Sequence, residues 1–168
     1  MSIAESLLPE FDQEMAATRR LLERTPEAQP GWKPHVKSME LGRLAVHLAL
    51  LPSWATMTLQ QTELDVHPPD GSSFTMPPFQ STAALLDLFD ESGKNARAAV
   101  AAASDRDFLV PWTLKSGGIA AFTLPRVAVV RSFVMNHLIH HRGQYTVYLR
   151  LREVPLPQLY GPTADEPM

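Results

Sequence analysis

The chain has 168 residues, of which 45% are apolar and 20% are charged, a balance typical of a globular protein with a hydrophobic core. Its formal net charge is -3 and it contains no basic run, which argues against nucleic-acid-binding proteins and against attachment to anionic membranes. Cysteine is absent, and this excludes disulfides, thiolate metal sites and a cysteine nucleophile supplied by the chain itself.

The first residues, MSIAESLLPEF, have no basic stretch followed by an apolar core, so they do not form a signal peptide. No apolar stretch approaches the ~20 residues that a membrane-spanning helix requires. We therefore expect a cytoplasmic protein without membrane attachment, formed by a single domain over residues 1–168.

The first predicted helix runs from Ser2 to Arg24. Ser2 and Glu5 match a capping box, in which two side chains bind the free N–H groups of a helix start. Pro9 is unfavourable inside a helix and predicts a start further along. One face of the helix has residues at intervals of three and four positions: Leu8, Phe11, Met15, Thr18 and Leu22.

The second predicted helix runs from Met39 to Gln61 and follows a proline-rich loop, TPEAQPGWKPHVK. Ser38 is its predicted N-cap. Pro52 lies inside the helix and predicts a kink, because proline has no N–H to donate. The face that points to the core holds four residues: Leu44, His47, Leu51 and Trp54.

The third predicted helix runs from Thr82 to Ala103, is rich in alanine and leucine, and has Ser81 as its N-cap. The stretch before it, HPPDGSSFTMPPFQ, is predicted to be a loop from its proline and glycine content. Residues 105–122 look irregular, with KSGG as a turn and short strand pairing between residues 109–114 and 119–122.

The fourth predicted helix starts near Pro125, a residue suited to a first helical turn, and ends near Glu153. The tail after it contains four prolines and cannot form a long helix. Four long helices in one small domain predict an all-α protein, a four-helix bundle with long crossover loops.

Three histidines lie close together in the segment NHLIHHRGQY of the fourth helix. His137 and His141 are four residues apart, so they share a helix face and can reach one metal ion together. The predicted apolar stripe of this helix contains both: Val127, Val130, Val134, His137, His141, Gln144, Tyr148 and Leu151. Burying an imidazole without a partner costs roughly 1–3 kcal/mol, so a shared metal ion would explain two of them in consecutive core layers.

His47 is the predicted third ligand, because it lies on the core face of the second helix. Taken alone, a histidine on an apolar face such as His47 is more often a hydrogen-bonded core residue than a metal ligand. The pair His137 and His141 lacks the intervening glutamate of the zinc-protease motif HExxH. Three neutral imidazoles that leave a coordination position open suit zinc, nickel, iron or cobalt.

Other residues near the cluster have less direct predicted roles. His140 lies toward the edge of the stripe, where it is expected beside the site or on the surface. Gln144, one turn further along, would orient a ligand or a bound water. Arg142 points ~100° away from the stripe, which predicts a salt bridge within the chain or across a dimer. His35 and His67 lie in proline-rich loops and are expected to be exposed.

The segment HLIHHRGQY, together with the histidine in LGRLAVHLALLPSW, resembles the DinB/YfiT-like family of metal-binding four-helix bundles. The segments GWKPHVKSM and PLPQLYGPTADE extend this resemblance from Trp32 to Glu166. It implies that His47, His137 and His141 hold a divalent ion, zinc or nickel, and that the protein is a homodimer. Some members of that family are transferases or isomerases that use a low-molecular-weight thiol such as bacillithiol or mycothiol.

Two hypotheses about function follow. The first is a metal-dependent enzyme with a small-molecule substrate, in which the ion activates a low-molecular-weight thiol for S-transfer or a water for hydrolysis. The second is a non-catalytic metal-binding protein of the stress response, in which the ion stabilises the fold. The sequence does not decide between them, and an open coordination position would favour an enzyme.

Overall fold

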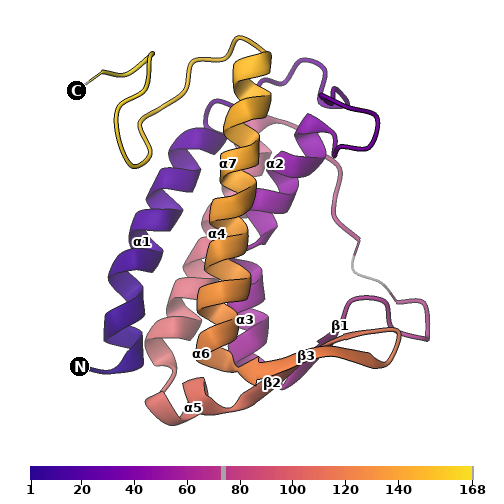
Figure 1. Cartoon of the computed structure of the whole chain (residues 1–168), viewed down its shortest axis with the longest axis vertical. Helices are drawn as coiled ribbons and strands as arrows, with labels where there is room; N and C mark the ends of the chain where they lie inside the picture. Colours follow the sequence, from indigo (N-terminus) through magenta and orange to yellow (C-terminus); the bar gives the residue numbers. More distant parts are fainter. Residues whose placement is uncertain (73–74, 168) are drawn as a thin grey trace.

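The computed structural model describes residues 1–72 and 75–167 (Figure 1). The helices are α1 (Ile3–Leu22), α2 (Leu41–Leu50), α3 (Ser53–Gln60), α4 (Thr82–Ala102), α5 (Asp105–Leu109), α6 (Arg126–Ala128), the π-helix η1 (Val129–Met135) and α7 (Asn136–Leu151). The strands are β1 (Glu63–Asp65), β2 (Pro111–Ser116) and β3 (Ile119–Pro125). None of the described helices is long and apolar enough to span a membrane.

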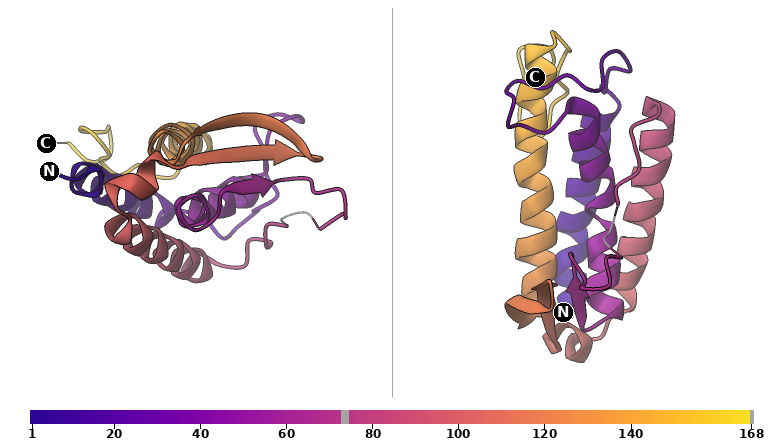
Figure 2. Two further views of the ribbon diagram at one scale, coloured as in Figure 1. Left: turned by 90° about the horizontal axis from the view of Figure 1, so that it is seen from below. Right: turned by 90° about the vertical axis from the view of Figure 1, so that its right-hand side faces the viewer.

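The protein is mostly helical, as predicted, with its long helices side by side (Figures 1 and 2). α1 packs against α4, and α2 packs against both α4 and α7. The connection from α3 to α4 returns along the molecule and includes the predicted loop HPPDGSSFTMPPFQ, whose residues 73 and 74 lie outside the described part. The predicted all-α class needs one correction, because a three-stranded sheet of order β1-β2-β3 extends from one end.

Two clusters of buried side chains make up the core. The first, which includes Leu44 and Leu138, lies between α2, α4 and α7. The second, which includes Phe11 and Met135, joins α1, α5 and η1. Along the chain, His137 lies between Met135 of the second cluster and Leu138 of the first, at the junction of the two clusters.

The start of α1 confirms the predicted capping box. The Ser2 hydroxyl accepts a hydrogen bond from the Glu5 N–H at 3.2 Å, and the Glu5 carboxylate accepts one from the Ser2 N–H at 2.7 Å. Pro9 lies inside the helix, so the prediction of a later start is wrong. Buried Leu7 and Phe11 on either side of Pro9 hold the helix against the core, which outweighs the loss of one backbone hydrogen bond.

The second predicted helix is divided into α2 and α3 at Pro52, which confirms the break but not the start. Ser38 is not the N-cap; Glu40 is, and its side chain makes no capping hydrogen bond. Carbonyl groups of the preceding loop accept hydrogen bonds from the first helical N–H groups instead, those of Leu41 and Gly42, each at 2.8 Å. A side chain at Gly42 would come within 2.9 Å of Phe79 and Pro30, so only glycine allows this close approach.

The region between α4 and α6 is more regular than predicted. Ser81 caps α4 as expected, with its hydroxyl accepting from the Ala84 N–H at 3.1 Å. The two predicted strands are confirmed as the antiparallel pair β2 and β3. The short helix α5 and strand β1, which pairs in parallel with β2, were not predicted. Asp65 of β1 accepts hydrogen bonds from the N–H groups of Gly117 and Gly118, which ties β1 to the hairpin turn.

The last helical segment begins at Arg126, after Pro125 as N-cap, and ends at Leu151. The π-helix η1 inside this segment, seven residues long, was not predicted. Its hydrogen bonds span five residues instead of four, so each turn contains one residue more than an α-helical turn. An extra residue rotates the rest of the helix by ~100°. The predicted stripe is therefore only partly right after Val134. Tyr148 is buried as predicted, and His137 and His141 are half-buried, but Gln144 and Leu151 are exposed. The other buried positions of α7 lie off the stripe: Leu138, Arg142, Tyr145 and Leu149.

Arg142 consequently lies in the core rather than on the outer face, and it forms the predicted salt bridge within the chain. Its guanidinium is 2.5 Å from the Glu14 carboxylate of α1, and the two side chains are 1% and 5% exposed. The same guanidinium donates to the Glu14 carbonyl oxygen and to the Thr18 hydroxyl. Tyr160 of the C-terminal tail donates to Glu14 at 2.8 Å and accepts from Arg142. This network joins α1, α7 and the tail.

Candidate metal centre

The three predicted ligands converge in the structure. His47 comes from the second half of α2, and His137 and His141 come from the first turns of α7. The Nε2 atom of His137 is 3.4 Å from Nε2 of His47 and 2.9 Å from Nε2 of His141. All three rings are half-buried. Because α2 and α7 pack directly against each other, residues 90 positions apart share one site.

These nitrogens lie close to the spacing that a metal ion requires. Two imidazole nitrogens bound to one tetrahedral zinc, each at about 2.0–2.1 Å, lie about 3.3–3.4 Å apart. The ligand atoms of the three residues all lie within 4.8 Å of one another, so small rotations of the rings bring them to this separation. Three neutral nitrogens form a donor set suited to zinc or nickel.

A hydrogen bond favours the tautomer of His141 that leaves Nε2 free. Gln144 Oε1 is 2.7 Å from Nδ1 of His141, so this nitrogen donates to the amide oxygen and Nε2 keeps its lone pair. Nδ1 of His137 is buried and makes no well-formed hydrogen bond, but the Phe133 carbonyl oxygen is close enough to favour a proton there. Gln144 thus contacts and orients the His141 ring.

Burial keeps the cluster uncharged. Loss of solvent lowers the pKa of His47 to about 4, and the neighbouring His141 and His137 and the positive charge of Arg43 add to this effect. Burial likewise lowers the pKa of His137 to about 4, and it lowers the pKa of His141. At neutral pH the three rings are therefore in the form that binds a cation.

This charge state predicts an unusual pH profile for metal binding. Imidazoles with the ordinary pKa of 6.5 would lose affinity as soon as the pH fell below that value. A pKa of about 4 leaves His47 and His137 neutral over this range, so zinc affinity should change little between about pH 7.5 and about pH 5.5 and should fall at lower pH. Competition titration of the metal-free protein with zinc measures this. A fall of about tenfold or more per unit beginning near pH 6.5 would contradict it.

A mostly apolar cleft of about 220 Å³ opens beside His47. Its apolar wall is formed by Leu50, Trp54, Met57, Leu64, Val66 and Met76, and its polar residues besides His47 are Asp65 and His67. Trp54, predicted on the core face of the second helix, is part of this wall. Leu64, Val66 and Met76 were not predicted, because they lie in β1 and the loops around it, where no periodic pattern marks them.

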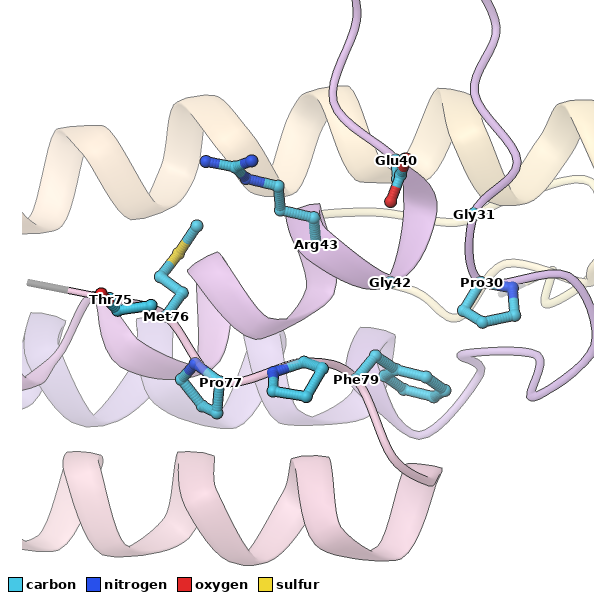
Figure 3. A pocket seen from close by; sticks show the side chains of 10 residues that line it. Pro30, Gly31, Glu40, Gly42, Arg43, Thr75, Met76, Pro77 and Phe79 are labelled. Carbon is cyan, nitrogen blue, oxygen red and sulfur yellow. The ribbon is translucent and has the colours of Figure 1, made fainter.

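A longer groove of about 510 Å³ runs beside the start of α2 (Figure 3). Arg43 and Glu40 line one side, and Met76, Pro77 and Phe79 line the other. Met76 also lines the cleft beside His47, so the two hollows adjoin at this side chain.

The remaining histidines stay outside the cluster. His140 is exposed, and its ring contacts that of His141 with the centroids 5.0 Å apart. His35 and His67 are exposed as predicted, and His67 Nδ1 is 3.1 Å from the Ser116 hydroxyl. Tyr145 is buried, and its hydroxyl donates to Thr25 at 2.8 Å, which assigns it to the core.

Comparisons with known proteins agree with this fold. A DinB-like protein from Bacillus cereus ATCC 10987 is 20% identical, with a TM-score of 0.69 over 93% of this chain and 97% of that chain. The DinB-like protein YjoA from Bacillus subtilis is 16% identical, with a TM-score of 0.66 over 97% of this chain and 99% of that chain. No curated protein matches this chain.

The family comparison covers most of the chain. Residues 10–145 match the sequence model of the DinB superfamily, and this segment contains His47, His137 and His141. The helical fold, the solved structures similar to it and this match agree, and the chain belongs to the DinB superfamily.

Proposed function

We propose that His47, His137 and His141 bind a divalent metal ion, zinc or nickel, and that the protein is a metal-dependent enzyme acting on a small molecule. The convergence of three Nε2 atoms from two helices carries this proposal. The low pKa values of His47 and His137 support it, because protons would not compete with the ion at neutral pH.

The reaction that fits best is S-transfer from a low-molecular-weight thiol. An ion held by three imidazoles lowers the pKa of a thiol that reaches it. The chain has no cysteine, so the sulfur must come from a separate molecule. Trp54 and Phe133 place aromatic rings beside the site, with their centroids 5.3 Å apart and that of Phe133 5.6 Å from the His137 ring. Gln144 holds the His141 ring in place.

This proposal is tested by thiol conjugation to chlorodinitrobenzene. The sulfur forms a bond to the ring carbon, chloride leaves, and the thiol proton goes to solvent. With zinc- or nickel-loaded protein, bacillithiol or mycothiol should react at least ~10-fold faster than with metal-free protein, as expected when a metal raises the thiolate fraction. His137→Ala should lose this acceleration, whereas His35→Ala should keep it.

The other outcomes of the same assay separate the alternatives. Metal-dependent hydrolysis of an activated ester, with no thiol-dependent rate, would replace S-transfer by a hydrolase. Tight metal binding with neither activity would leave a non-catalytic metal-binding protein of the stress response, and the ion would then stabilise the fold.

The proposal also covers the domain organisation of the chain and its binding partners. We take residues 1–168 as one domain, a four-helix bundle in which α2 and α3 together form the second helix. A homodimer in the cytoplasm, without nucleic-acid or membrane partners, remains a prediction from the sequence. Val147 and Leu151, exposed on α7 at 57% and 54%, form an apolar surface suited to a second copy.

A further inference from the structure

The residues around the groove and the cleft differ in chemical character. The cleft beside His47 has an apolar wall that includes Trp54 and Met57. The adjoining groove carries Arg43, which precedes His47 by four residues and therefore lies on the same face of α2, about one turn away. A ligand that passes Met76 would contact both an apolar surface and a cation.

The guanidinium of Arg43 is available for such a ligand. Arg43 is exposed, and within the described chain its side chain makes no hydrogen bond or ion pair. Glu40 lines the same groove but does not pair with it. Several other arginines are neutralised by carboxylates: Arg19, Arg24, Arg97, Arg131, Arg142 and Arg150.

We propose that the small molecule which reaches the three-histidine centre is an amphipathic carboxylate, with its carboxylate on Arg43 and its apolar body in the cleft beside His47. Arginine suits this partner because its planar guanidinium binds both oxygens of a carboxylate at once. The apolar wall gains from covering a hydrocarbon body that would otherwise face water. This inference rests on the proposed function, because it takes the histidine centre as the reacting end.

The test compares the binding of phenylbutyrate with that of its neutral amide, phenylbutyramide, by calorimetry near neutral pH. The two probes differ in charge and share one apolar body. We expect the carboxylate to bind at least ~10-fold more tightly, the effect of one charge-assisted hydrogen bond. Metal-free protein is used first, since no ion can then hold the carboxylate.

Four variants, one of them a control, assign the parts of the site. Arg43→Gln should abolish the preference for phenylbutyrate, and Arg43→Lys should restore part of it by keeping the charge. Arg106→Gln is the matched control, because Arg106 is also exposed and unpaired but lies on α5 at the other end of the molecule, and this variant should keep the preference. Met57→Gln should weaken both probes to a similar degree by making the cleft polar.

The outcomes distinguish this inference from the function on which it rests. A preference that survives Arg43→Gln, or equal binding of the two probes to wild-type protein, would overturn the inference even if metal content and thiol conjugation are normal. A protein that binds no metal but prefers phenylbutyrate through Arg43 would overturn the proposed function and leave the carboxylate site standing.

Discussion

Purified His47→Ala, His137→Ala and His141→Ala proteins are each expected to contain almost no metal, and the wild-type protein is expected to contain one ion per chain. Removing the partner of a ligand typically weakens metal binding by about 10- to 100-fold, so loss of a ligand itself should exceed ~100-fold. Elemental analysis gives the metal content, and competition with a chelator gives the affinity.

Two neighbouring residues provide comparisons, of which His140 is the matched control. His140→Ala removes an exposed imidazole that contacts His141 but does not converge with the cluster, so metal content should be unchanged. Gln144→Ala should weaken binding by about 10- to 100-fold, because His141 Nδ1 loses the oxygen that fixes its tautomer. Undiminished metal in all three ligand variants would refute the assignment of the site.

Replacing Arg142 with methionine is expected to lower the free energy of unfolding by about 3–5 kcal/mol, because Glu14 then stays buried without its cation. For a chain of this size, such a loss lowers the melting temperature by roughly 10 °C. Urea unfolding of the metal-free protein measures the change without a contribution from bound metal. The double variant Glu14→Gln with Arg142→Met should recover part of the loss, since no unpaired charge remains.

An exposed ion pair serves as the comparison. Arg97 and Asp12 are 2.8 Å apart, with side chains 52% and 44% exposed, so Arg97→Met should change the free energy of unfolding by less than about 1 kcal/mol. Tyr160→Phe should cost about 1 kcal/mol, because it removes one hydroxyl from the buried network and leaves the ion pair in place. Equal effects of Arg142→Met and Arg97→Met would contradict the structural role of Arg142.

The hydrogen-bond network around Arg142 also influences the position of two candidate metal ligands, His137 and His141. Arg142 follows His141 directly and anchors α7 to α1 through Glu14. The position of α7 relative to the other helices therefore depends on the residue next to a candidate ligand. A buried pair at this point fixes the rotation of α7, and with it the direction of His137 and His141.

Local patterns in the sequence determined the features that depend on neighbouring residues. The capping side chains of Ser2 and Ser81 fixed two helix starts, because each binds an N–H group within three residues. Pro52 fixed the break between α2 and α3. The spacing of His137 and His141 placed two imidazoles on one helix face before any fold was known.

Only the tertiary structure decided the features that depend on packing between elements. His47 meets His137 because α2 and α7 pack together, a contact that no local pattern encodes. The π-helix η1 rotated α7, so that Arg142 is buried, whereas a regular period of ~3.6 residues placed it off the core stripe. Periodicity describes one helix by itself; the burial of a side chain is set by the surfaces that the rest of the chain brings to it.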